Sequence, residues 1–404
     1  MSRLNTTPSI LPILLTLVFA AGCKSVIERQ DVRPRVLRDV PARNLAYRLS
    51  PDVSLPPNLT PDEVPDKDVN IANDFAAKRE NDALVRTITS PDGKRVLALY
   101  GTEDEPSSAF RIDLYSSEGE FLRNLIPPDI SCLFPETVAW SPDGRFINFI
   151  ARKRVAPSPT PTPPNQPEPE PLASPLGLPD ATPSVAPLFP SVASFNTEQI
   201  YICNRDGFDL KPLTSREGLI YFYFAWAPDS HAMVALACTE DEWNGRERQY
   251  KQPAGRPRLI TPDGNERLLD DGLTDALPVW CPDASKVATA FDTDIAIYDA
   301  GGNTPTQGRV PLGDQLIAAS VSYEEKSGTK KASANANANP AASPSPASSS
   351  TVPPSFNPIV TLQWPAPEML YFKTAYVRVM PSETINTFQR WHQLNLSAQA
   401  AILK

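Results

Sequence analysis

The chain has 404 residues, a formal net charge of −9, 46 prolines and only two histidines. An acidic chain lacks the basic face that phosphate binding requires, so the charge argues against a nucleic-acid-binding protein. The two histidines, His231 and His392, lie far apart in the sequence, which excludes a histidine-rich metal site and argues against a Ser-His-Asp triad.

The N-terminal segment has the composition of an export signal. Arg3 is followed by the apolar run ILPILLTLVFAAG and then by Cys23; the run is short for a transmembrane helix and fits a signal-peptide core. The ending AAGC resembles the lipobox of bacterial lipoproteins, in which small residues precede a cysteine that receives a diacylglycerol. This resemblance implies a signal peptide over residues 1–22, a membrane anchor on Cys23 and, from Lys24, a place in the cell envelope on the outer membrane facing the periplasm. The alternative is an ordinary secretory signal that is cut near Ala21.

The next segment, residues 24–82, does not share the pattern of the rest of the chain. Its stretch LSPDVSLPPNL contains a Pro-Asp corner, but no apolar strand follows it. We therefore expect residues 23–82 to form a lipidated N-terminus and an extended tether, with one strand docking on the domain that follows.

From residue 83 onward a short motif recurs five times. Each copy joins two apolar runs through a corner of Pro and a polar or acidic residue: ITSPDGKRVLALYG, AWSPDGRFINFIA, AWAPDSHAMVALA, VWCPDASKVATAF and QWPAPEMLYFKTA. The recurring residues are Asp92, Asp143, Asp229 and Asp283 at the corner, and Trp140, Trp226, Trp280 and Trp364 before it. Residues 156–192 and 326–357 are biased toward proline or small residues, and we expect them to be disordered inserts. Without them the motif recurs about every 50 residues, a period typical of a β-propeller.

A second turn signal divides each unit into four strands. A glycine separates two strand-like runs in IDLYSSEGEFLRNL and YICNRDGFDLKPL, and RWHQLNLSAQAAILK takes this place in the last unit. The motif Trp-Ser-Pro-Asp-Gly, complete at Trp140 to Gly144, resembles the WD40-like repeats of the TolB family, which also occur in the propeller domains of prolyl oligopeptidase relatives. We therefore predict an all-β fold over residues 83–404: a β-propeller of about five four-stranded blades, with six as the alternative.

The corner aspartates have a structural interpretation. Pro presets the first turn position, Asp accepts backbone N–H groups, and Gly adopts the left-handed conformation that closes the turn. Asp143 has equivalents in three of the other four units, as a structural element would, whereas a catalytic acid is needed only once. We interpret Asp143 and its equivalents as turn residues, and the tryptophans as packing between blades.

Acidic residues follow the second strand of three units, on the face that would also carry the two inserts. They are Glu103, Asp104 and Glu105 in LALYGTEDE, Glu240, Asp241 and Glu242 in VALACTEDE, and Asp292 and Asp294 in FDTD. Four interpretations stay open: exposed loops that keep the protein soluble, a surface for a basic segment of a partner, a calcium site, or the acid and base of a glycoside hydrolase. Calcium is the lesser option, because the spaced DxDxDG loop does not occur.

The sequence favours a protein that binds rather than catalyses. The motifs GxSxG, GxGxxG and GxxxxGKS do not occur, and Cys203 and Cys238 lie inside apolar runs, where we expect buried side chains. We therefore predict a non-catalytic envelope lipoprotein without cofactor or metal, whose acidic face binds another envelope protein, and the TolB resemblance implies a scaffold role. The alternative is a propeller that binds or hydrolyses carbohydrate with the same acidic residues.

Overall fold

The computed structural model describes residues 36–56, 59, 67–79, 81–102, 109–153, 197–249, 251–336, 357–376 and 388–398. These belong to one compact unit, residues 36–404. The predicted signal peptide, Cys23, Glu103, Asp104, Glu105 and the insert at 156–192 lie outside the described residues. None of the described helices is long and apolar enough to cross a membrane.

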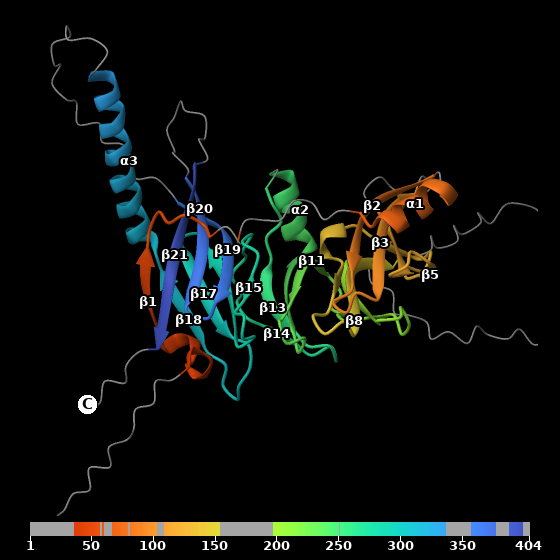
Figure 1. Ribbon diagram of the computed structural model, residues 1–404. Coiled ribbons are helices and arrows are strands. Elements are labelled where there is room, and N and C mark those ends of the chain that lie inside the picture. The colour runs from red at the N-terminus through yellow and green to blue at the C-terminus, as the bar shows by residue number, and fades with distance from the viewer. Residues whose placement is uncertain are drawn as a thin grey trace, which may run out of the picture. The chain divides into compact units, whose positions relative to one another are not determined.

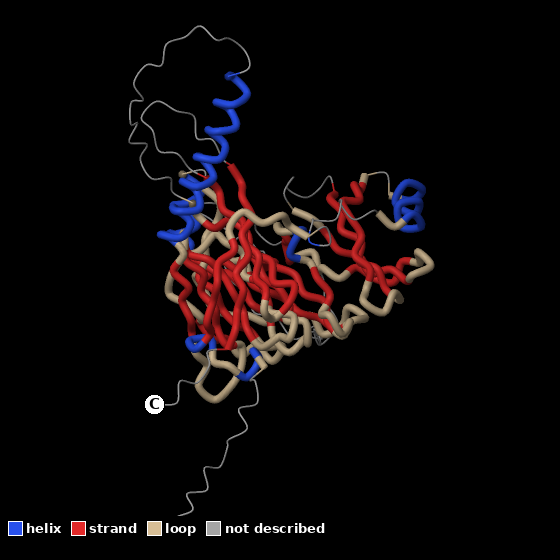
Figure 2. Tube along the Cα trace, turned by 60° about the vertical axis from the view of Figure 1, so that its left-hand side comes forward, coloured by secondary structure: helices blue, strands red, loops and turns tan. Residues whose placement is uncertain are grey.

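The described residues are mostly β-structure, arranged as five antiparallel sheets (Figures 1 and 2). The first sheet contains β2 (Asp82–Thr89), β3 (Arg95–Thr102), β4 (Arg111–Ser116) and β5 (Phe121–Asn124). The second contains β6 (Ile130–Cys132), β7 (Ala139–Trp140), β8 (Phe146–Lys153), β9 (Gln199–Asn204) and β10 (Lys211–Pro212). The third contains β11 (Leu219–Trp226), β12 (Met233–Thr239), β13 (Arg256–Ile260) and β14 (Glu266–Leu268). The fourth contains β15 (Val279–Trp280), β16 (Lys286–Phe291), β17 (Asp294–Asp299) and β18 (Gln307–Pro311).

The fifth sheet takes its outer strand from the other end of the chain. Its order is β1 (Leu45–Ser50), β21 (Phe388–Ala398), β20 (Met369–Tyr376) and β19 (Ile359–Ala366), with Leu45 opposite Ala398 and Ser50 opposite Gln393. The expectation that residues 390–404 supply both the third and the fourth strand of the last unit is wrong. β21 is one continuous strand, and β1 pairs with the edge of β21 that β20 leaves open. Pairing with β1 covers backbone N–H and C=O groups that an edge strand would otherwise expose.

The segment before the first sheet is more ordered than an extended tether. It contains two 3-10 turns, η1 (Leu37–Asp39) and η2 (Ala42–Asn44), strand β1, and helix α1 (Val69–Lys78). Asp68 caps α1 by accepting from the N–H groups of Asn70 and Ile71. Ile71 and Phe75, one turn apart, are buried against the first sheet. We call residues 36–50, from η1 to the end of β1, the N-terminal strap.

Two other helices follow strands. α2 (Glu240–Arg248) comes directly after β12, and α3 (Gly313–Ala336) follows β18. α3 reaches into the expected insert at 326–357, because its composition of Ala, Lys, Glu and Ser is compatible with a helix as far as Ala336.

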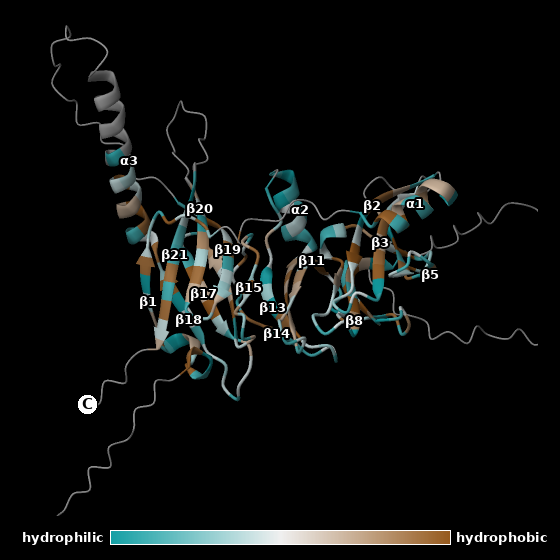
Figure 3. Ribbon diagram, viewed as in Figure 1, coloured by the Kyte–Doolittle hydropathy of each residue, from teal (hydrophilic) through white to brown (hydrophobic). Residues whose placement is uncertain are grey.

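Apolar side chains pack between consecutive sheets, which Figure 3 shows as brown bands along the strands. Leu97 and Leu99 of the first sheet share a cluster with Phe149 of the second, and a further cluster joins the second and third sheets. Others join the third sheet to the fourth and the fourth to the fifth. Successive antiparallel sheets of four or five strands that stack face to face through such clusters are the arrangement of a propeller-like fold.

Candidate functional site

The Pro-Asp corners form tight turns of one design. In each turn the aspartate accepts the backbone N–H of the residue two positions later, at 3.0–3.2 Å: Lys94, Arg145, His231 and Ser285 are the four donors. The residue after the aspartate has positive φ, and it is Gly93, Gly144, Ser230 or Ala284. Each carboxylate therefore closes its own turn. This is the role of a turn residue, which the repeat predicts for Asp92, Asp143, Asp229 and Asp283.

The first three turns contact one another in sequence. Gly144 lies against Pro91 of the first sheet's turn, and the Asp143 N–H donates to the Ser230 hydroxyl at 3.0 Å. Between the third and fourth turns the structure instead has a cavity of about 740 Å³. That volume is within the range of small-ligand and peptide pockets.

Four segments wall this cavity, which we call the turn-face cavity. They are the third-sheet turn at 227–232, the fourth-sheet turn at 284–286, the loop at 299–304 after β17, and residues 38–41 of the N-terminal strap. Leu259 and Trp280 add apolar surface, and the Trp280 indole N–H donates to the Ala225 carbonyl at 3.0 Å. The site thus combines apolar walls with polar turns contributed by chain segments that are distant in sequence.

A buried ion pair lies among the lining residues. Lys286 and Asp299 are directly opposite each other on β16 and β17, with Nζ 3.6 Å from Oδ1. The Lys286 ammonium donates to the Arg38 carbonyl at 3.3 Å, and Asp299 accepts from the Ala42 N–H and from both the N–H and the hydroxyl of Thr306. The pair therefore holds the N-terminal strap against the fourth sheet.

The rim of the turn-face cavity carries charge of both signs. Asp39 and Asp229 line it together with Arg38 and His231, and the His231 side chain is 86% exposed. The His231 Nδ1 lies 2.8 Å from the Asp229 carbonyl oxygen, so the ring is oriented by its own turn. The rim can therefore contact a ligand that carries both a positive and a negative group, each next to a side chain of opposite charge.

The predicted acidic residues of the third unit do not line this cavity. Glu240, Asp241 and Glu242 form the first turn of α2, where Thr239 and Glu242 make a capping box. Glu242 also makes a bidentate ion pair with Arg256 at 2.7 and 2.8 Å, which lowers the pKa of this carboxyl to about 2. The interpretation of this stretch as an open loop is wrong, because TEDE is a helix-capping sequence placed directly after a strand.

The recurring tryptophans pack at sheet boundaries. Trp140 and Trp280 are buried, and each donates its indole N–H to a carbonyl of the preceding sheet, Ile88 and Ala225 respectively. Trp364 is also buried but donates to Pro367 within its own strand pair, at 3.3 Å. Trp226 is half-buried, and its indole nitrogen has no hydrogen-bond partner within the described part of the chain.

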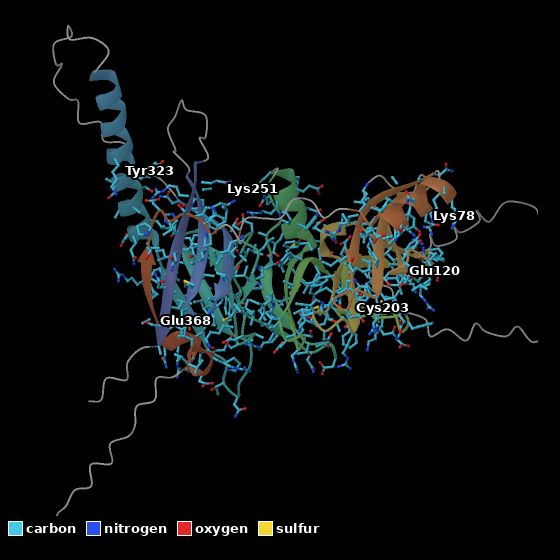
Figure 4. All side chains as sticks on the ribbon, in the orientation of Figure 1. Lys78, Glu120, Cys203, Lys251, Tyr323 and Glu368 are labelled. Carbon is cyan, nitrogen blue, oxygen red and sulfur yellow. The ribbon has the colours of Figure 1, made fainter. Side chains whose placement is uncertain are left out.

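The cysteines of the sheets are buried thiols. Cys132, Cys203, Cys238 and Cys281 are all buried, and Cys203 lies among the packed side chains in Figure 4. Burial raises the pKa of the Cys203, Cys238 and Cys281 thiols to about 12. Within the described ranges, no group of three His, Cys, Asp or Glu side chains is placed to hold a metal ion.

Sequence reasoning did not identify the turn-face cavity, although it named two of the lining residues, Asp229 and Trp280, as parts of the repeat. One signal was available. Only in the fourth unit does the hairpin register place a lysine opposite an aspartate, Lys286 opposite Asp299. The same position in the first unit places Arg95 opposite Ser116. Nothing in the sequence near Arg38 indicates that it contacts a lysine 248 residues away.

No protein-family model matches the chain, and no curated protein matches it in sequence. Among solved structures it is similar to prolyl oligopeptidase B from Galerina marginata at 11% identity and a TM-score of 0.38, over 76% of this chain and 33% of that one. It is similar to an oligogalacturonate lyase in complex with manganese at 11% identity and 0.35, over 77% and 64%. It is also similar to a putative TolB from Agrobacterium tumefaciens at 14% identity and 0.20, over 46% and 64%. The chain thus spans a third to about two thirds of these proteins, and TM-scores this low assign it no activity.

Proposed function

We propose that this chain is a lipid-anchored, non-catalytic protein of the bacterial cell envelope, and that its propeller of five blades binds a segment of another envelope protein. The observation that carries the proposal is the turn-face cavity, where apolar walls, a buried ion pair and a charged rim meet between two blades. Binding sites of this kind are typically lined by apolar surface with a few placed polar groups.

The bonding of the ionisable groups supports binding rather than catalysis. Asp229 closes its own turn, and Asp299 accepts three hydrogen bonds from neutral donors. Carboxylates that accept hydrogen bonds within the protein in this way stabilise the loops that form the surface. A general acid or base must instead be free to exchange a proton with a substrate. In this proposal the function rests on shape and charge at the cavity.

The membrane part of the proposal rests on the AAGC sequence at Cys23. Arg38 in the cavity wall comes only fifteen positions after Cys23. A chain of that length spans at most about 50 Å when fully extended. A lipid on Cys23 would therefore keep the cavity within reach of proteins embedded in, or bound to, the same membrane.

The test is site-specific photo-crosslinking in cells that express the full chain. A crosslinking residue at Asn303, in the exposed loop of the cavity, should capture a protein partner in the envelope fraction. The matched control is Asp241, which is equally exposed but lies on α2, in the acidic segment that the sequence singled out. Capture from Asp241 and none from Asn303 would refute the cavity as the binding site and favour the acidic face.

A further inference from the structure

We propose that the segment bound in the turn-face cavity presents a single carboxylate, and that the Lys286 ammonium receives it. This inference rests on the proposed function, because it takes the cavity to be the peptide-binding site. It adds the chemistry by which the partner is recognised.

The first argument is the unused donor capacity of Lys286. The residue is 3% exposed, and an ammonium has three donors. Among the described residues, its nitrogen makes one hydrogen bond, to the Arg38 carbonyl, and lies 3.6 Å from Asp299, beyond hydrogen-bond distance. A ligand oxygen can therefore take a donor that the protein leaves unused.

The second argument is that Asp299 is occupied by other groups. One of its oxygens accepts the Ala42 N–H at 3.0 Å, and the other accepts the Thr306 N–H at 2.8 Å and the Thr306 hydroxyl at 2.6 Å. These neutral donors satisfy the carboxylate without the lysine. An incoming carboxylate would therefore gain a charge-assisted hydrogen bond from Lys286 without displacing Asp299 from its partners.

The third argument limits the ligand to one negative charge. Asp39 and Asp229 line the same cavity beside Arg38, so a phosphate or a run of acidic residues would meet like charges there. The same two carboxylates favour a basic or neutral residue next to the bound group. Trp280 and Leu259 supply apolar surface for a side chain of the bound segment.

A peptide has two sources of a single carboxylate, its C-terminus and an Asp or Glu side chain. The probes are three random hexapeptide pools applied to the immobilised full chain: free C-terminus without Asp or Glu, C-terminal amide with one Asp or Glu, and C-terminal amide with neither. We expect at least one of the first two pools to be retained about tenfold more than the third, which corresponds to about 1.4 kcal/mol of binding free energy. The pool that is retained identifies the source of the carboxylate.

Three variants test the role of the lysine. Lys286→Met should abolish the preference for carboxylates, and Lys286→Arg should keep it if the variant folds. Lys94→Met is the matched control, because Lys94 is an exposed lysine at the equivalent turn of the first sheet. Equal retention of the three pools by the wild-type chain, or an unchanged preference in Lys286→Met, would overturn the inference.

Thr304→Trp separates this inference from the proposed function. Thr304 is exposed in the cavity loop and takes no part in the ion pair, so a bulky residue there should block the cavity without disturbing Lys286. One result would separate the two claims: wild type retains the three pools equally, and Thr304→Trp retains none of them. It would overturn the inference that a carboxylate is recognised but support the cavity as the peptide-binding site. Retention that Thr304→Trp leaves unchanged, or no retention by wild type, overturns both.

Discussion

His392 makes the stability of the fifth sheet depend on pH. The ring is 1% exposed; its Nδ1 accepts the Asp52 backbone N–H at 3.3 Å, and its Nε2 lies 3.1 Å from the Thr374 hydroxyl. Burial, and next to it the positive charge of Arg390, lower the pKa of His392 from 6.5 to about 4, whereas Asp52 acts in the opposite direction. In the neutral ring, Nδ1 accepts a hydrogen bond from the Asp52 N–H. Protonation would add a proton to Nδ1, and this proton would face the Asp52 N–H.

The sign and size of the effect follow from linkage. Between pH 6.5 and about 4 the unfolded chain binds a proton at this residue and the folded chain does not, so the free energy of unfolding should fall as the pH is lowered through that window. At about 1.4 kcal/mol for each pH unit, the loss should reach about 3 kcal/mol near pH 4 and not grow further below it.

The assay is urea denaturation at a series of pH values between 7 and 4, with wild type compared to His392→Gln. The variant should lack the part of the slope that His392 contributes. The matched control is His231→Gln, which changes the other histidine, whose side chain is exposed, and should retain the part of the slope that His392 contributes. Identical slopes for wild type and His392→Gln would refute this reasoning.

Four further outcomes are expected. Asp143→Ala should lower the free energy of unfolding by about 1 kcal/mol in urea, as the loss of a capping side chain does. Trp280→Ala should cost about 3–5 kcal/mol by the same measurement, since a buried ring and its bond to the third sheet are both lost. Because the pKa of Glu242 is lowered from 4.5 to about 2, its stabilisation is present above pH 4.5 and lost toward pH 2, and Glu242→Gln should flatten the stability curve in that window. Cys23→Ser should accumulate as unprocessed precursor on fractionation, and normal processing to a soluble product in this variant would contradict the lipid anchor.

The repeat allowed most of the sheet architecture to be predicted, because its signals are local. A Pro-Asp corner and a strand on each side of it lie within about a dozen residues, and turn chemistry determines their geometry. The strands around Asp143 and Asp229 were identified in this way. The partner of β21 could not be found locally, since Leu45 and Ala398 meet across almost the whole chain.

The acidic face stays a prediction, because Glu103, Asp104 and Glu105 lie outside the described residues. Acidic composition singled out Glu240 to Glu242, where the Thr-x-x-Glu spacing from Thr239 to Glu242 was an available signal of a helix start. The sequence does not show that Arg256 neutralises Glu242. The turn-face cavity lies between the third and fourth turns, and a space between two turns has no sequence motif. Only the register pair of Lys286 and Asp299 could have indicated it.

The N-terminal strap links the anchor, the fold and the cavity. Its β1 completes the fifth sheet, and its Arg38 and Ala42 bond to the ion pair of the fourth. The fit is close: a Cβ at Gly308 would come within 2.5 Å of the Ala42 carbonyl oxygen. A ligand held by Lys286 would therefore favour the docked strap, and by reciprocity a docked strap would favour the ligand. Since the strap is also the segment nearest the proposed lipid, any force on the anchor would act first on the wall of the binding site.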